Sequence, residues 1–205
     1  MLTLQPDRVA IFGYAHLPSR IKHQRQIDEA ALPGLAERYA SANLAARRML
    51  EAGYVRVGFD HFALPNDALA TGRLHRNFQG YTTDSADALL GFGPSSIARL
   101  PQGYAQNAVP LADYTRRISE HGVSAARGYA FTRDDIIRNF TIERLMCDLA
   151  FPAEQLRARF GEEAKPILAL AQDLLVSNRD GFVEPLNDGF SVTERGRMFV
   201  RTICS

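Results

Sequence analysis

The hydrophobic and polar positions of the first sixty residues predict two strands joined by a long helix. Residues 33–52 carry apolar side chains at helical spacing, with Pro33 and Gly34 at the start and Gly53 after the end. Short apolar runs at residues 8–14 and 54–60 predict the strands. Such a unit favours parallel strands. The inward face of the helix is expected to hold Leu35, Tyr39, Ala42, Ala46 and Met49.

Parallel strands place their ends on the same side, so residues 14–16 and 60–62 are expected to converge there. One strand–helix–strand unit cannot close a barrel by itself, and the remaining strands would have to come from elsewhere. The fold class predicted for residues 1–122 is therefore α/β, as part of a (β/α) barrel.

The second half of the chain predicts a mainly helical domain, residues 123–205. Short helices are expected at 85–90 and 111–121, and Thr132 caps a longer helix at 133–149. Pro152 begins the next helix, and residues 162–177 form a third. Two short strands then flank the turn Asn187-Asp188-Gly189. Three helices followed by a hairpin are typical of a winged helix.

Composition indicates a globular protein with no strong electrostatic field. The 205 residues are 46% hydrophobic and 23% charged, with a formal net charge of +1. Residues 123–205 hold eleven Lys and Arg against twelve Asp and Glu, so the predicted winged helix is not expected to bind nucleic acid. We also expect no membrane partner and a cytoplasmic location, because the sequence shows no spanning run and no signal-peptide pattern.

Cysteine and histidine do not predict a metal site. Cys147 and Cys204 are far apart and form no CxxC pattern, so we expect two buried thiols. His16, His61 and His75 could suggest a three-histidine site, since two of them end predicted strands. They lack ligand spacing, and each could equally donate to a carbonyl or a carboxylate.

Residues 74–84, LHRNFQGYTTD, show neither helical nor strand period and predict a loop built for contacts. The glycines of GFGPSSI, residues 91–97, follow closely. This glycine pair could be a simple turn or a phosphate cradle, although Pro94 removes one amide donor. A third interpretation, which we prefer, is close backbone approach to a nucleoside-like ligand lying against Ile97.

These segments, together with YAHLP (residues 14–18), DHFALPND (60–67), YAQN (104–107) and VTERGRMFVRTIC (192–204), resemble the oxygen-independent coproporphyrinogen III oxidases, a radical S-adenosylmethionine family. The resemblance covers nearly the whole chain in family order. It implies a C-terminal portion of such an enzyme, comprising part of the radical S-adenosylmethionine barrel and then the winged-helix-like domain, which would cap the barrel mouth. The chain is shorter than the family pattern between Asp67 and Leu74.

The resemblance implies S-adenosylmethionine as cofactor, and Ala15, Phe78, Gln79 and Ile97 fall where the family contacts it. It also implies a four-iron four-sulfur cluster, held in the family by CxxxCxxC. That motif is absent here, so this chain alone is expected to be inactive. Catalytic residues are not predicted. His75 and Arg76 could meet a substrate propionate, or be solvated loop charges.

The implied activity is oxidoreductase chemistry in haem biosynthesis, the conversion of coproporphyrinogen III to protoporphyrinogen IX. We expect a full-length monomer served by an electron donor that the sequence does not identify. Two alternatives remain open: a haem-binding chaperone relative of the same family, or a non-catalytic fragment.

Overall fold

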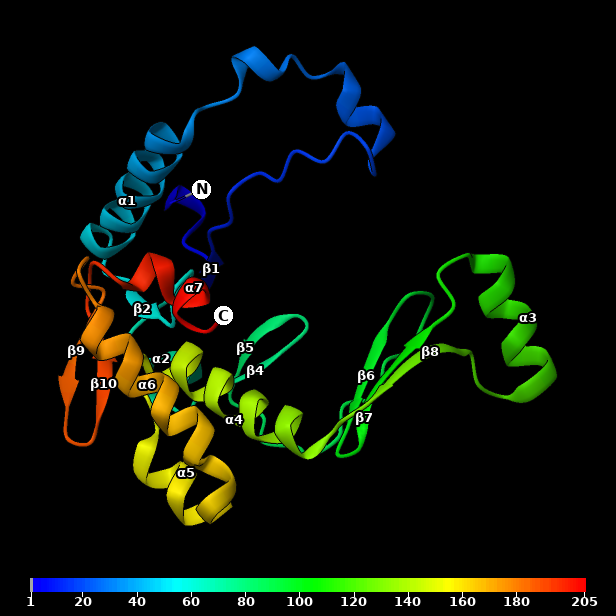
Figure 1. Cartoon of the computed structure of the whole chain (residues 1–205). Coiled ribbons are helices and arrows are strands. Elements are labelled where there is room, and N and C mark those ends of the chain that lie inside the picture. The colour runs from blue at the N-terminus through cyan, green and yellow to red at the C-terminus, as the bar shows by residue number, and fades with distance from the viewer. Residues whose placement is uncertain (1) are drawn as a thin grey trace. The chain divides into compact units, whose positions relative to one another are not determined.

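Helix α1 (Leu35–Glu51) dominates the first of two compact units in the computed structural model, which describes residues 2–205. The first unit spans Met1–Arg73 and the second Leu74–Ser205, and each is considered by itself (Figure 1). The backbone N–H of Gly34 donates to Glu37 Oε2 at 2.9 Å at the start of α1. Gly53, just beyond its end, has φ 87°, the left-handed conformation that glycine adopts without strain. The predicted helix is confirmed.

The remaining elements of the first unit are short. The 3-10 helices are η1 (Leu2–Leu4), η2 (Lys22–Gln26) and η3 (Glu29–Ala31); the strands are β1 (Arg8–Ala10), β2 (Val55–Val57) and β3 (His61–Ala63); and α2 covers Ala68–Thr71.

The predicted parallel pairing is wrong. The sheet order is β1-β3-β2, and β3 is antiparallel to both neighbours. Gly58, with φ 58°, lies in the turn after β2, and the chain folds straight back as β3. The strands β1 and β2 therefore run in the same direction but are separated by β3. The described residues form no (β/α) barrel, and mixed helices and small sheets replace that part of the predicted fold class.

The core of the first unit lies between α1 and this sheet. Ala46 and Met49 are buried with Tyr54 and Phe62. The Tyr54 hydroxyl donates to the Pro6 carbonyl at 2.6 Å, which gives the buried phenol a partner. Two predicted inward positions were wrong, since Leu35 is 87% exposed and Tyr39 is 44% exposed.

The second unit opens with a β-hairpin, β4 (His75–Asn77) and β5 (Gly80–Thr82), where the sequence predicted a loop. Three-residue strands are too short to show a period, which explains the error. The predicted helix at 85–90 is also wrong. Asp84 Oδ1 accepts the Ala86 N–H at 2.9 Å, and Leu89 forms an isolated bridge with Arg99.

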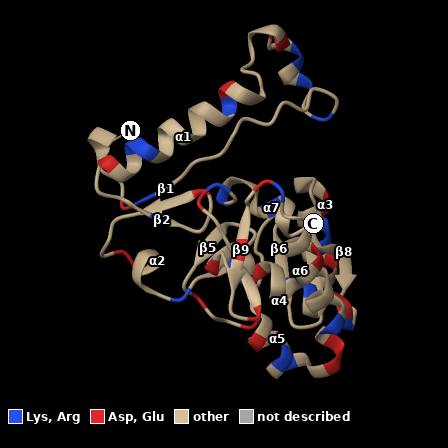
Figure 2. Ribbon diagram, turned by 60° about the vertical axis from the view of Figure 1, so that its left-hand side comes forward, with Lys and Arg blue, Asp and Glu red and all other residues tan. Residues whose placement is uncertain are grey.

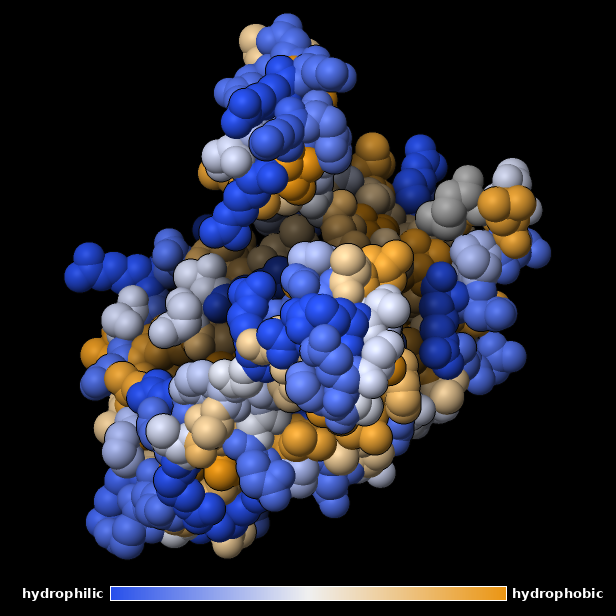
Figure 3. Space-filling model, turned by 90° about the vertical axis from the view of Figure 1, so that its right-hand side faces the viewer, coloured by the Kyte–Doolittle hydropathy of each residue, from blue (hydrophilic) through white to orange (hydrophobic). Residues whose placement is uncertain are grey.

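A three-stranded antiparallel sheet follows, in the order β6 (Ile97–Leu100), β7 (Gly103–Asn107) and β8 (Ala125–Ala130). Helix α3 (Leu111–His121) connects β7 to β8 and ends at Gly122 (φ 72°), as predicted. Strand β8 lies at the edge of the sheet, and all six of its residues are exposed. Hydrophobic side chains lie among hydrophilic ones on the face shown in Figure 3.

The last segment confirms the predicted order of three helices and a hairpin. Thr132 caps α4 by accepting the Asp135 N–H at 3.1 Å. The elements are α4 (Arg133–Asp148), α5 (Ala153–Phe160), η4 (Gly161–Ala164), α6 (Lys165–Ser177), β9 (Val183–Leu186), β10 (Gly189–Val192), η5 (Arg197–Phe199) and α7 (Val200–Ile203). Leu156, Phe190 and Val200 are buried in this segment. Blue and red residues are interleaved along these helices in Figure 2.

The predicted division into domains of residues 1–122 and 123–205 stays a prediction. Among residues 2–205, no helix is both long enough and apolar enough to cross a bilayer.

Candidate functional site

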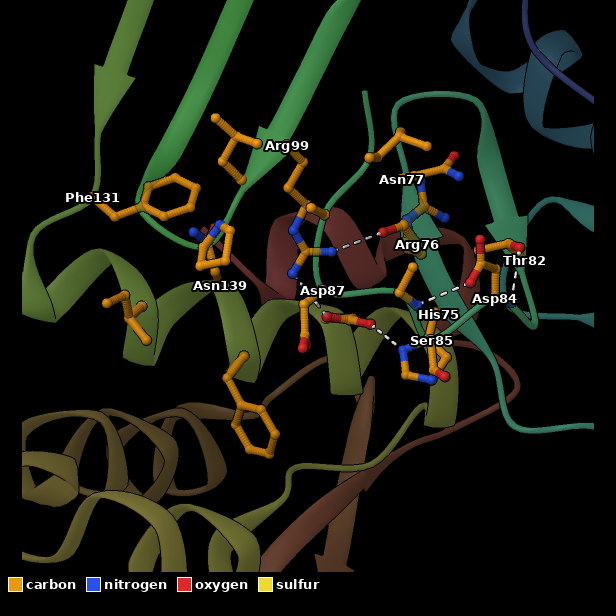
Figure 4. Close-up of a pocket in the computed structure, with 18 of the residues that line it drawn as sticks. His75, Arg76, Asn77, Thr82, Asp84, Ser85, Asp87, Arg99, Phe131 and Asn139 are labelled. Atoms are coloured by element: carbon orange, nitrogen blue, oxygen red, sulfur yellow. Dashed lines mark hydrogen bonds and ion pairs between the residues drawn. The ribbon is translucent and has the colours of Figure 1, made fainter. Parts of the chain in front are cut away.

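A cavity of about 510 Å³ lies in the second unit beside helix α4 (Figure 4). Its walls come from the hairpin β4–β5, the segment 84–89, the end of β6 and one face of α4. Aromatic and aliphatic side chains on one part of the lining are Phe131, Ile136 and Phe140. The cavity thus combines an apolar surface with charged side chains, among them Arg76, Arg99 and Glu143.

Glu143 of α4 is the centre of the charged part. Its Oε1 lies 2.9 Å from His75 Nδ1, and its Oε2 lies 3.7 Å from Arg99 Nη2. In Figure 4 the dashed line from His75 and one of the two from Arg99 mark these interactions; the other line from Arg99 runs to the Arg76 carbonyl. The side chains of Glu143 and His75 are only 17% and 24% exposed, so the pair is partly shielded from water.

Arg144, the next residue of α4, fastens the helix to the hairpin. Its side chain is 3% exposed. Nη2 donates to the Leu74 carbonyl at 2.6 Å and Nη1 to the Asp148 carboxylate at 3.1 Å. A buried guanidinium requires such partners, and here they fix the first strand of the hairpin against α4.

The cavity is close to neutral. Arg76, Arg99 and Arg159 line it together with three carboxylates, Asp84, Asp87 and Glu143. The Arg159 guanidinium lies over the rings of Phe140 and Phe160, at 5.0 and 5.4 Å from their centroids. The arrangement can bind a ligand with both apolar and polar groups, and does not favour one sign of charge.

The two cysteines are unsuited to hold metal. Burial raises the pKa of the Cys147 thiol to about 12 and that of Cys204 to about 11. Both thiols are therefore protonated at neutral pH, whereas thiolates bind metals. Residues 2–205 contain no group of three or more His, Cys, Asp or Glu that could hold a metal ion.

Phe78 and Gln79 form the tip of the β4–β5 hairpin. The Phe78 ring is 55% exposed and meets the edge of the Tyr104 ring, with centroids 5.0 Å apart. Asn77 Oδ1 accepts the backbone N–H of Gln79 at 2.8 Å and shapes the turn. Phe78 also lines a smaller cavity of about 160 Å³, together with Tyr104 and Glu143. The tip thus presents an aromatic ring at the surface.

Ile97 is the first residue of β6 and is half-buried. It pairs with Gln106 of β7, and the loop that precedes it touches its backbone at Gly91. Ala15 belongs to the other unit, where its carbonyl accepts Gln24 Nε2 at 3.0 Å. Phe78, Gln79 and Ile97 therefore share one unit, which does not include Ala15.

The histidines have separate partners. His16 Nε2 lies 3.1 Å from Glu29, and His61 Nδ1 lies 2.6 Å from Asp60, consistent with the interpretation that each pairs with a neighbouring polar group.

Sequence reasoning missed Arg99, Glu143 and Arg144. Arg99 and Glu143 are far apart in the sequence, and a charged residue on an amphipathic helix is usually solvated. The position of Glu143 and Arg144 among the apolar residues of α4 was the available signal, since buried charges need partners.

Comparison with known proteins identifies the class of the last segment: residues 131–199 match the family described as the HemN C-terminal domain. The chain is 43% identical to an oxygen-independent coproporphyrinogen III oxidase of Bradyrhizobium diazoefficiens over 208 residues, covering 100% of this chain and 46% of the relative. A coproporphyrinogen III oxidase, anaerobic 1, of Cereibacter sphaeroides is 45% identical, covering 99% and 46%.

A solved structure agrees with these relatives. The chain superposes with a TM-score of 0.91 and 37% identity on a structure titled "Coproporphyrinogen III oxidase (HemN) from Escherichia coli is a Radical SAM enzyme", covering 99% of this chain and 48% of that one. The family resemblance is confirmed: the chain is similar over its whole length to about half of the oxygen-independent coproporphyrinogen III oxidases, and its residues 131–199 match a domain described as C-terminal. It spans about half the length of the curated relatives it matches.

Proposed function

We propose that this chain acts as the C-terminal portion of an oxygen-independent coproporphyrinogen III oxidase. The observation that carries the proposal is similarity over its entire length, 43% identity together with a TM-score of 0.91. In this reaction a propionate side chain of coproporphyrinogen III loses a hydrogen atom, carbon dioxide and one electron and becomes a vinyl group. S-adenosylmethionine, when bound, supplies the chemistry that removes the hydrogen atom.

The residues present do not fit the iron–sulfur cluster. Three thiolates are needed, and this chain has two cysteines, buried Cys147 and half-buried Cys204, whose thiol pKa values are raised. No step is assigned to a cluster on this chain. Its ligands would belong to the part of the relatives that this chain does not match.

The residues present do fit one part of an S-adenosylmethionine site. The exposed Phe78 ring offers an aromatic face, and half-buried Ile97 offers an aliphatic one. The side-chain amide of Gln79 has no hydrogen-bond partner among residues 2–205 and can bond a polar edge of the cofactor. We assign Phe78, Gln79 and Ile97 to cofactor contact. The assignment of Ala15 rests on the family resemblance alone and stays a prediction.

A chimera tests the function. The segment of the Bradyrhizobium oxidase that aligns with this chain is replaced by residues 1–205, and the anaerobic chimera is assayed for conversion of coproporphyrinogen III. We expect vinyl product. If the chimera is folded and carries its cluster but yields no product while the parent oxidase does, the proposal is wrong and the alternative of a non-catalytic fragment is favoured.

Gln79→Ala in the same chimera tests the cofactor contact. Loss of one neutral hydrogen bond of about 0.5 to 1.5 kcal/mol should weaken S-adenosylmethionine binding by about two- to tenfold while folding is preserved. Unchanged binding would remove Gln79 from the proposed site.

A further inference from the structure

Asn107, at the end of β7, makes more side-chain contacts with the loop between Leu90 and Ile97 than the other two residues that hold it: Gln106 Nε2 donates to the Ser95 carbonyl at 3.1 Å, and the Tyr114 hydroxyl accepts the Gly93 N–H at 3.2 Å. Asn107 Nδ2 lies 3.1 Å from the Gly91 carbonyl, 3.0 Å from the Gly93 carbonyl and 3.1 Å from Ser96 Oγ. One amide group therefore connects three points of a loop that lies 11 to 16 residues away in the sequence.

The chemistry of the contacts fixes the orientation of this amide. Two of its three neighbours are carbonyl oxygens, which only accept hydrogen bonds. The NH₂ group must face them, because the opposite orientation would place Oδ1 against two like dipoles. The Ser96 hydroxyl in turn donates to the Gly93 carbonyl at 2.6 Å, which adds to the same network.

The backbone of the loop requires this support. Gly93 has φ 95° and Ser95 has φ 62°, and a left-handed serine is uncommon without a compensating contact. Ser95 N donates to the Ala108 carbonyl at 2.9 Å, and Asn107 N donates to the Ser96 carbonyl at 3.0 Å. The loop is thus bonded to the end of β7 by both backbone and side chain.

The loop lies against Ile97, whose backbone is also paired with Gln106 of β7. A Cβ atom added at Gly91 would come within 2.9 to 3.0 Å of the Ile97 backbone, so the two segments touch. At the same point the register of β7 against β8 slips, with Gln106 opposite Arg127 but Asn107 opposite Ala125. That slip lies on the β8 side of β7. On the β6 side, backbone bonds continue from the strand into the loop, and the amide contacts of Asn107 add to them.

We propose that Asn107 is a positioning residue for S-adenosylmethionine binding, acting through the loop 91–96 on Ile97. This inference rests on the proposed function, which assigns Ile97 to cofactor contact. Other side chains do not replace Asn107. An aspartate would set a carboxylate against two carbonyl oxygens, and an alanine would remove the Asn107 donor from the Gly91 carbonyl and leave the Gly93 carbonyl with the Ser96 hydroxyl.

The test uses the chimera described above with Asn107→Ala and Asn107→Asp. S-adenosylmethionine affinity is measured by anaerobic equilibrium dialysis with labelled cofactor, and KM and kcat are measured separately. We expect both variants to raise Kd and KM for S-adenosylmethionine by about tenfold, with a smaller change in kcat at saturating cofactor. Asn43→Ala is the control, because it removes an exposed amide that donates to one carbonyl, that of Tyr39. Its affinity should match that of the parent chimera.

A pH profile separates positioning from loss of stability. The carboxyl group introduced by Asn107→Asp becomes a donor only when protonated, and the carbonyl oxygens beside it raise its pKa above the usual value of about 3.9. The Kd of this variant for S-adenosylmethionine should therefore improve as the pH falls from about 7 to about 5, while that of Asn107→Ala should not. If both variants melt at lower temperature but bind the cofactor like the parent, Asn107 is only structural and the inference is overturned.

A parent chimera that binds the cofactor but makes no vinyl product refutes the proposed function alone. A folded parent chimera that binds no cofactor refutes both.

Discussion

Replacement of Arg144 by methionine should destabilise the second unit strongly. The side chain is 3% exposed, so its partners lose a donor in a place that water reaches poorly. In the parent, Arg144 Nη2 lies 2.6 Å from the Leu74 carbonyl oxygen and 3.5 Å from Glu143 Oε1. Arg144→Met removes both contacts. Removal of one partner from a buried charged network costs about 3 to 5 kcal/mol.

Thermal melting measures the effect. For a protein of about 200 residues, 1 kcal/mol shifts Tm by about 2 to 4 °C, so Arg144→Met should lower Tm by about 6 to 20 °C. Arg138→Met is the matched control on the same helix. Its guanidinium is 49% exposed and pairs with Asp134 one turn earlier, a contact worth about 0 to 1 kcal/mol. If the two variants melt within about 2 °C of each other, the assigned role of Arg144 is wrong.

Three further predictions concern titratable groups. Buried Cys147, with a pKa raised to about 12, should resist iodoacetamide at neutral pH in the folded chain, and half-buried Cys204, with a pKa raised to about 11, should react slowly. Both should react faster after unfolding in urea, and rapid labelling of the native protein would contradict the raised pKa values. Anaerobic reconstitution of the chain alone with iron and sulfide should yield no stoichiometric cluster by absorbance and iron analysis. Hydrogen bonds from Thr132 hold the pKa of Asp135 below its usual range. A carboxyl group whose pKa is lower in the folded than in the unfolded state stabilises the fold when the pH is above the unfolded pKa. This stabilisation is lost as the pH falls through the folded pKa. The Tm difference between the parent and Asp135→Asn should therefore be largest near neutrality and shrink towards about pH 3.

The longer helices α1, α3 and α4 were predictable from the sequence because each carries a local start or stop signal. Thr132 with Asp135 three residues later, and Gly53 and Gly122 at helix ends, act locally and need no knowledge of the rest of the chain. Strand pairing was not predictable in the same way. Strands of three residues have no measurable period, and the turn at Gly58 decided the sheet order.

The same distinction between local signals and tertiary contacts applies to the residues of the candidate site. Phe78, Gln79 and Ile97 could be selected because they stand in short motifs that resemble a known family. Glu143 and Arg99 could not, since their pairing depends on how α4 packs against β6. The role of Asn107 was hidden for a further reason. Its residue type is ordinary, and only the positions of three acceptors around one amide reveal it.

The exposed edge strand β8 has a consequence for the behaviour of the protein at high concentration. Within residues 2–205 its outer edge pairs with no other strand, and its sequence AARGYA contains a single charge, Arg127. An unpaired edge of low charge is a template on which a second molecule can add its own strand, and self-association into aggregates begins in this way. Arg127 opposes it, because two copies that meet edge to edge bring like charges together. Arg127 thus acts as a gatekeeper for solubility, and its loss would expose the chain to precipitation.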